Sequence, residues 1–188
     1  MDHVAPEFFA NKIVIGVNDV YFKYPCDYLV RKEALGAEDA LQSGIPLLIS
    51  EYDCGNRRGG RKNSVNGTAW YYDHLNNECT AVDLSVVGTD QIVVSYSTIT
   101  SAIHIAGYMG AANIMICGHD GGMLDGRMQY QGYYQSDQSY AVWYQSWVRL
   151  IMGQSRALRD RLFDVYGCRV YSLNPFIGFD LEGHKFET

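Results

Sequence analysis

One stretch of the chain, residues 91–117, limits the fold more than any other part of the sequence. It begins and ends with apolar runs, at 91–96 and 113–117, that are rich in valine and isoleucine. Between these runs, residues 98–110 repeat their apolar side chains at the spacing of one helix face. Continuous apolar runs are typical of strands that are covered on both faces. A strand, a helix and a second strand in succession build a parallel sheet.

Further short apolar runs extend this pattern on both sides of the central unit. They predict strands over residues 12–17, 27–30, 45–49 and 169–173. Helical spacing predicts helices over residues 137–152 and 155–166, and another over residues 33–43. The sequence shows no internal repeat and no domain linker. We therefore expect one α/β domain over residues 1–188, with a Rossmann-like, mostly parallel sheet flanked by helices.

The composition excludes several classes of protein. Hydrophobic residues make up 47% of the chain and charged residues 19%, which is typical of a folded globular domain. A net charge of −6 opposes binding to a nucleic-acid backbone, and no apolar run reaches the roughly 18 residues of a membrane span. The amino terminus lacks the pattern of a secretory signal, and the five cysteines form no Cys-x-x-Cys pair. We expect a cytoplasmic protein with no nucleic-acid partner, no membrane span and no cysteine-based metal site.

Four hydroxyl side chains gather where the central helix begins: Ser97, Thr98, Thr100 and Ser101. One of them is enough to cap the helix, since a serine or threonine oxygen satisfies a free backbone amide. Four at a helix amino terminus also suit a phosphate or carboxylate, because the free amides and the helix dipole favour anions there. His104 shares a helix face with Thr100 and Ser101, where it either packs as a bystander or joins the same site.

The second strand of the central unit ends in an unusual sequence, MICGHDGG. Gly118, His119 and Asp120 follow the strand directly, and ligands bind beyond the carboxyl ends of the strands in a parallel sheet. If the two strands are neighbours, His119 and Asp120 face the four hydroxyl side chains across one crevice. A simple Asp-Gly turn is the alternative, and it accounts for Asp120 but not for His119.

Three other places supply candidate ligand contacts. Asn18 and Asp19 follow the first predicted strand, where they either contact a ligand or fix a turn. Arg57 and Arg58 belong to a basic loop that either clamps phosphate groups or is simply solvated. Tyr133 lies in a long irregular segment, residues 124–139, of the kind that often serves as a lid or binding loop.

Several of these segments together resemble the bacterial lipooligosaccharide sialyltransferases, the related 6-hydroxymethylpterin pyrophosphokinase-like domains and small phage proteins. The matching segments are Thr100-Ser101, residues 114–116, Gly118-x-Asp120 and Leu173-Asn174-Pro175, and Asn18 in GVNDVYF matches the family's nucleotide-contacting asparagine. The resemblance implies a Rossmann-like domain that binds a nucleotide or nucleotide sugar, with Asn18, Thr100 and Ser101 around the ligand. In the sialyltransferases the donor is CMP-sialic acid and no metal is strictly needed, so the resemblance implies no metal and no further cofactor.

The chain departs from that family in two places. The family begins with a glycine-rich loop that holds the nucleotide, and this chain begins after that point, like a small phage-type member. The region of the family's catalytic histidine reads QSWVRLIMGQSRAL here and contains no histidine. Arg149 falls near that place, but arginine stays charged and is a poor base.

Two hypotheses about function follow from these observations. The first is a nucleotide- or nucleotide-sugar-binding protein that acts as a divergent glycosyl- or phosphoryl-transferase. In it, His119 is the general base, and Asp120 orients it or holds the acceptor. The second is a phage-type protein that binds or sequesters a signalling nucleotide without converting it. The partner in both is a small nucleotide-like molecule, and the aromatic helix over residues 137–152 leaves a homo-oligomer open.

Overall fold

The larger of two sheets contains four parallel strands in the computed structural model, which describes residues 5–32, 37–50, 69–71, 82–95, 97–118 and 138–173. The strands are β1 (Ile15–Val17), β2 (Tyr28–Arg31), β3 (Leu47–Ile49) and β4 (Ala69–Tyr71), and they lie side by side in chain order. Parallel neighbours need connections that cross a face of the sheet, and the connection from β2 to β3 contains the short helix α1 (Glu38–Gln42).

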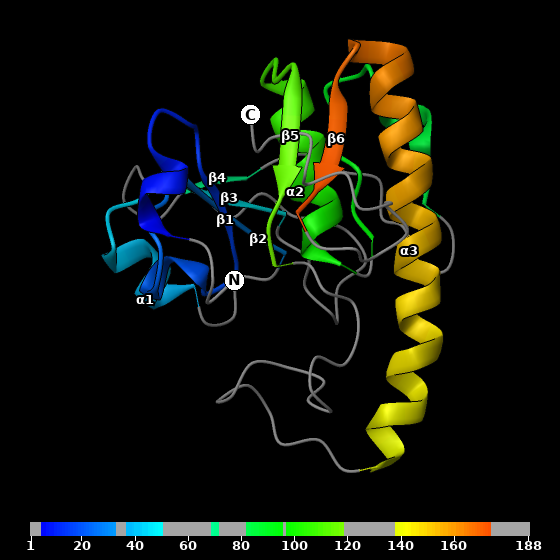
Figure 1. The fold of residues 1–188 in the computed structure, drawn as a ribbon, viewed down its shortest axis with the longest axis horizontal. Helices are drawn as coiled ribbons and strands as arrows, with labels where there is room; N and C mark the ends of the chain where they lie inside the picture. Colours follow the sequence, from blue (N-terminus) through cyan, green and yellow to red (C-terminus); the bar gives the residue numbers. More distant parts are fainter. Residues whose placement is uncertain are drawn as a thin grey trace.

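A second, smaller sheet pairs β5 (Asn113–Ile116) with β6 (Arg169–Ser172), also in parallel. Helix α2 (Thr98–Tyr108) leads into β5, and helix α3 (Gln138–Tyr166) leads into β6. Figure 1 shows β5 and β6 side by side, with α2 behind them and α3 along their outer side. The predicted α/β fold, with a mostly parallel sheet and helices, is therefore confirmed.

Side chains that alternate along the strands divide the core between the two faces of the larger sheet. Leu29 and Leu47 pack with the short helix α1 (Glu38–Gln42), whereas Val30 and Leu48 pack with α2. A third cluster joins α2, α3 and the smaller sheet, and it includes Ile103, Ile116, Leu158, Leu162 and Val170. Helix α2 therefore contributes to two parts of the core at once.

Residues 92–95 connect these parts of the core. Ile92 packs with α2 and the larger sheet, whereas Val93 packs with α3 and the smaller sheet. The sequence predicts a strand over residues 91–96, but in the described part of this segment only Ile92 makes an isolated strand bridge. The backbone N–H and carbonyl of Val93 are bonded to side chains of α2, so these groups do not extend a ladder with a neighbouring strand.

Other elements also differ from the predictions. The helices predicted over residues 137–152 and 155–166 form one helix. Gly153 does not interrupt it, because a glycine inside a helix costs only about 1 kcal/mol and this position is exposed. The helix predicted over residues 33–43 covers Glu38–Gln42 within the described residues. The sequence pattern does not predict β4 or the 3₁₀ helices η1 (Pro6–Phe9), η2 (Val20–Phe22) and η3 (Leu84–Val86), because elements this short carry too little periodicity.

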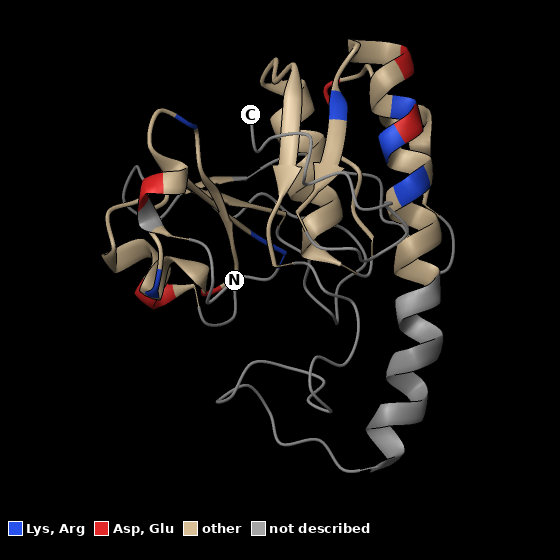
Figure 2. Ribbon diagram, viewed as in Figure 1, with Lys and Arg blue, Asp and Glu red and all other residues tan. Residues whose placement is uncertain are grey.

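Charged side chains of both signs share the carboxyl-terminal half of α3 (Figure 2). Arg159 Nε lies 3.1 Å from Asp160 Oδ1, and Arg156 and Asp164 are exposed on the same stretch. Mixed charge of this kind is typical of a solvated helix face rather than of a track for a nucleic-acid backbone. Across the described ranges, no helix combines the length and the apolar character that crossing a bilayer requires.

Candidate functional site

The carboxyl ends of β1 and β2 carry a group of polar side chains. Asn18 follows β1 with a left-handed backbone, φ = 55°, and its N–H donates to the carbonyl of Val30 at 3.1 Å. Asp19 Oδ1 lies 2.6 Å from Nη1 of Arg31, the last residue of β2. A left-handed backbone is uncommon for residues other than glycine, and such strain tends to persist at functional sites. An amide, a carboxylate and a guanidinium therefore lie together at this edge.

Arg31 is a member of this group that the sequence analysis does not identify. Its side chain is 13% exposed and that of Asp19 is 34% exposed, so solvent screens this ion pair less than a pair on the open surface. Ser50, which follows β3, closes the same edge by donating from Oγ to the carbonyl of Lys32 at 2.6 Å. An arginine that ends an apolar run directly, as in YLVR, is the sequence signal that indicates this position.

The four hydroxyl side chains at the start of α2 divide into two pairs by burial. Thr100 and Ser101 are fully buried, whereas Ser97 and Thr98 are half-buried. Thr100 Oγ1 accepts a hydrogen bond from Ser95 Oγ at 2.8 Å. The Ser97 side chain makes no capping bond to the helix within the described part of the chain. A ligand approaching the start of α2 would therefore meet Ser97 and Thr98 before the buried pair.

His104 is also fully buried, and it faces the backbone of Val93. The N–H of Val93 donates to His104 Nδ1 at 2.9 Å, and Ser101 Oγ donates to the carbonyl of Val93 at 2.9 Å. Burial lowers the pKa of His104 to about 4, so the ring is neutral at neutral pH and carries its proton on Nε2. On its other side the ring stacks near Tyr166 of α3, with ring centres 6.2 Å apart. His104 thus holds residues 92–95 against α2.

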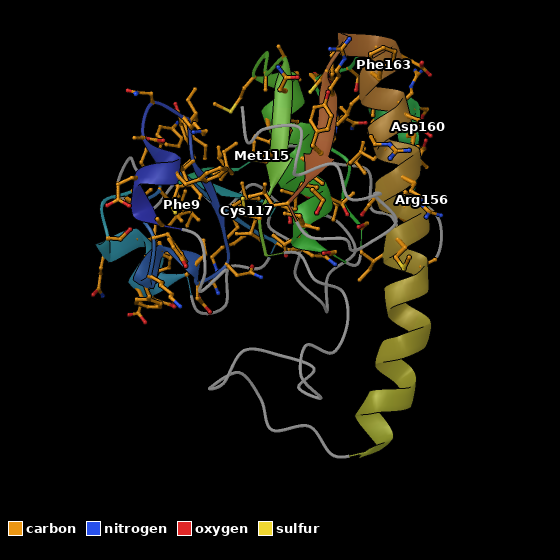
Figure 3. The ribbon with its side chains drawn as sticks, viewed as in Figure 1. Phe9, Met115, Cys117, Arg156, Asp160 and Phe163 are labelled. Carbon is orange, nitrogen blue, oxygen red and sulfur yellow. The ribbon has the colours of Figure 1, made fainter. Side chains whose placement is uncertain are left out.

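Strand β5 is followed by Cys117 and Gly118, the two residues that precede the predicted catalytic pair in the sequence. Gly118 has φ = 74°, a left-handed conformation that favours glycine. Cys117, labelled in Figure 3, is half-buried, and burial raises the pKa of its thiol to about 11. The thiol is therefore protonated at neutral pH and is a weak nucleophile.

Five of the predicted site residues lie outside the described residues: His119, Asp120, Arg57, Arg58 and Tyr133. Their placement around this edge stays a prediction from the sequence. Gly118, two residues after the end of β5, is the described residue that precedes His119 in the sequence.

Helix α2 links the polar groups that the structure describes. The turn at residues 109–112 reverses the chain, so that β5 runs back along α2 and ends at the level of the start of the helix. Helix α2 also contacts β1 and β2, through a cluster that contains Ala102 and Ile105 (Figure 1). The starts of helices and the carboxyl ends of strands share one edge in a parallel unit. We refer to the residues that follow β1 and β5, end β2 or begin α2, namely Asn18, Asp19, Arg31, Ser97, Thr98 and Gly118, together as the carboxyl edge.

A shallow hollow of about 250 Å³ lies at the opposite ends of β1 and β2, with Phe9, Lys12 and Asp27 in its lining. Lys12 Nζ donates to the carbonyl of Phe8 and lies 4.7 Å from the centre of its ring. Asp27 accepts a hydrogen bond from the N–H of Val14 at 2.7 Å. The charged groups of the hollow are therefore engaged locally, and the hollow is separate from the carboxyl edge.

Comparison of the chain with protein family models, with curated proteins and with solved structures gives no match. The resemblance to the sialyltransferases therefore depends on the residues that carry it. Within the ranges that the structure describes, no three His, Cys, Asp or Glu side chains are grouped to hold a metal ion. At the carboxyl edge, the described residues offer backbone amides, hydroxyls, the amide side chain of Asn18 and the Asp19–Arg31 ion pair.

Proposed function

We propose that the protein binds a nucleotide or nucleotide sugar at the carboxyl edge of a Rossmann-like domain. One observation supports this above all: the left-handed Asn18 and the Asp19–Arg31 ion pair lie at the carboxyl ends of β1 and β2, two strands that α2 contacts. Ligands of parallel α/β proteins bind beyond the carboxyl ends of the strands, and helix amino termini favour their anionic groups.

Each described residue has a part in this proposal. The Asn18 side chain contacts the base or the sugar, and Arg31 holds the Asp19 carboxylate in place to accept a sugar hydroxyl. The half-buried Ser97 and Thr98 lie nearest to the anionic group of the ligand. Thr100, Ser101 and His104 support the site from within the core, because their hydrogen bonds fix residues 92–95 to α2.

We further propose that, as an enzyme, the protein is a glycosyl- or phosphoryl-transferase with His119 as its general base and Asp120 beside it. His104 does not take this role, because it is neither exposed to a ligand nor poised near neutral pH. Replacing His119 with Ala should then abolish turnover and leave nucleotide binding intact. Equal loss of binding and turnover would contradict the role of a base.

A binding protein that sequesters a nucleotide without converting it is the second candidate. It is favoured because the described titratable side chains near the site are already bonded within the protein and so are poor general bases. Asp19 is paired with Arg31, and His104 accepts a hydrogen bond from Val93. The two candidates differ in the fate of the ligand. Incubation with nucleoside phosphates and nucleotide sugars, followed by heat release and mass spectrometry, separates them. Intact ligand in stoichiometric amount indicates sequestration, and altered ligand indicates an enzyme.

Two asparagines provide a matched test of the binding edge. Asn18 and Asn11 both have left-handed backbones, with φ of 55° and 61°, but Asn11 precedes β1 and lies away from the carboxyl edge. Glycine adopts this conformation without strain, so Asn18→Gly and Asn11→Gly each remove only a side chain. We expect Asn18→Gly to weaken nucleotide binding by about tenfold, the usual effect of one lost hydrogen bond to a ligand, and Asn11→Gly to leave it unchanged. Equal affinities for both variants would contradict the proposed site.

A further inference from the structure

Ser155 of α3 has a buried hydroxyl group that makes no hydrogen bond within the described residues. Its side chain is 1% exposed, and its Oγ has no hydrogen-bond partner in the structure as described. Serine inside a helix usually turns to solvent or bonds the carbonyl four residues earlier, and Ser155 does neither. A buried hydroxyl without a partner lowers stability, so its presence calls for a physical explanation.

The direction of Ser155 follows from the packing of α3 on α2. Helices α2 and α3 run in the same direction, because each leads by a short turn into one of the parallel strands β5 and β6 (Figure 1). Gly107 of α2 lies against Leu162 of α3, since a Cβ built on this glycine would be 3.1 Å from a Leu162 methyl group. One turn earlier, Ile103 and Leu158 share a core cluster. Residues that lie further along α2 therefore pack against residues that lie further along α3.

Ser155 lies on the face of α3 that packs against α2, at the level of the first turns of α2. It precedes Leu162 by seven residues, which is nearly two full turns, so both side chains leave α3 in almost the same direction. Seven residues before Gly107 on α2 is Thr100, in the first turn of that helix. In Figure 3, Arg156, the neighbour of Ser155, lies on α3 at the height of Cys117 at the end of β5. The Ser155 side chain thus faces the first turn of α2, opposite Thr100.

The amino end of α2 offers hydrogen-bond donors at the same place. The N–H of Thr100 donates to the carbonyl of Ser97 and the N–H of Ser97 to Ser95 Oγ, but in the described structure the Ser97 side chain caps neither Thr98 nor Ile99, the first two residues of the helix. We propose that the Ser155 hydroxyl and the first-turn amides of α2 together bind a phosphate group. This inference rests on the proposed function, and it names the part of the ligand that this side of the carboxyl edge recognises. A phosphate oxygen provides an acceptor for the Ser155 hydroxyl and for the N–H groups of Thr98 and Ile99.

The proposal predicts opposite effects of Ser155→Ala on stability and on binding. Removing a hydroxyl that has no partner leaves the ligand-free protein as stable as the wild type or more stable. Removing a phosphate contact weakens binding by about tenfold, as expected for a hydrogen bond to a charged group. Ser101→Ala is the matched control for stability, because Ser101 is an equally buried serine on the facing helix whose hydroxyl is bonded to Val93.

The experiment compares the wild type and Ser155→Ala by calorimetric titration with ADP, GDP, CDP, UDP and inorganic pyrophosphate, and by urea unfolding. Weaker binding of any of these probes without loss of stability supports the phosphate site. Equal binding of a nucleoside diphosphate by both proteins overturns the role of Ser155 and leaves the proposed function standing. Binding of pyrophosphate alone, weakened in the variant, supports the phosphate site and contradicts the nucleotide. Lower stability of Ser155→Ala, comparable to that of Ser101→Ala, overturns the premise that the hydroxyl has no structural partner.

Discussion

The Nδ1 atom of His104 accepts a hydrogen bond of 2.9 Å from the backbone N–H of Val93, and the bond links a buried titratable ring to the segment that precedes α2. Nδ1 can accept only while the ring is neutral. Protonation replaces its lone pair with a second N–H, so that Val93 loses its acceptor and the core gains a buried charge. No described carboxylate compensates for that charge, because burial alone accounts for the low pKa of His104, and Tyr166 faces the ring from α3.

Acid should therefore destabilise the protein through His104. Burial holds the pKa of this ring at about 4 in the folded chain, against 6.5 for an exposed histidine, so the unfolded chain binds the proton first as the pH falls. The contribution to stability is complete above pH 6.5, and about 2 to 3 kcal/mol of it is lost between pH 6.5 and pH 4. Urea unfolding at a series of pH values measures this loss.

His104→Asn is the control for the acid effect. The asparagine oxygen offers Val93 an acceptor in place of Nδ1, and the amide does not titrate. The variant should be less stable than the wild type at pH 7.5, because the smaller side chain leaves a cavity, but should lose much less stability on acidification. If its stability fell by the same amount from pH 6.5 to pH 4, other groups would be responsible for the acid sensitivity.

Ser101→Ala should lower the free energy of unfolding by about 1 to 3 kcal/mol, because it leaves the buried carbonyl of Val93 without its donor. Ser97→Ala removes a half-buried hydroxyl that makes no capping bond to α2, and should change stability by less than about 0.5 kcal/mol. Denaturant unfolding of the two variants under one set of conditions gives the comparison. Similar losses in both would mean that the bond from Ser101 to Val93 contributes little.

Two glycine-to-alanine substitutions should have opposite signs. A Cβ on Gly16, in the centre of β1, would lie 2.6 Å from Cys26 Sγ and 2.8 Å from a Leu29 methyl carbon. Gly16→Ala should therefore destabilise the protein by about 1 to 3 kcal/mol. Gly153 lies within α3 with open space around it, so Gly153→Ala should stabilise the protein by up to about 1 kcal/mol. Thermal unfolding of both variants tests the pair, and a stabilising Gly16→Ala would contradict the packing around β1.

The ion pair between Asp19 and Arg31 should contribute a coupling energy of about 1 kcal/mol at low salt. A double-mutant cycle with Asp19→Asn, Arg31→Gln and the double variant isolates this energy from the other effects of each change. The coupling should decrease in 1 M NaCl, because the Asp19 side chain is partly exposed and salt screens it. An undetectable coupling at low salt would show that Arg31 does not hold the Asp19 carboxylate.

Local patterns in the sequence predict most of the parallel strands, because the runs at 12–17, 27–30, 45–49, 113–117 and 169–173 each contain one, whereas the described part of the run at 91–96 does not. Val30 and Ile116, for example, are buried residues of such runs. The same reasoning fails where long-range packing decides. Gly153 suggests an interruption, yet α3 continues through it, since Ile151 and Leu158 on either side of it are buried in the core.

The candidate site could be predicted only in outline. A hydroxyl at the start of a helix has the same sequence signature whether it caps the helix, binds an anion or bonds to a buried backbone group. Thr100 and Ser101 make bonds of the last kind, to Ser95 and Val93, and no local pattern distinguishes them from Ser97. Arg31 escapes prediction for a related reason: its ion pair depends on Asp19, a residue of the connection from β1 to β2 that only the fold brings close.

Ile92 and Val93 are adjacent in the chain, yet their side chains anchor different regions of the hydrophobic interior. If either region unfolded, Ile92 or Val93 would lose its packing partners, and the loosened dipeptide would destabilise the other region. The protein should consequently denature as one cooperative unit, with calorimetric and van't Hoff enthalpies that agree. Fragments divided at this dipeptide should not fold independently, because each would expose an apolar surface that its counterpart covers in the intact chain.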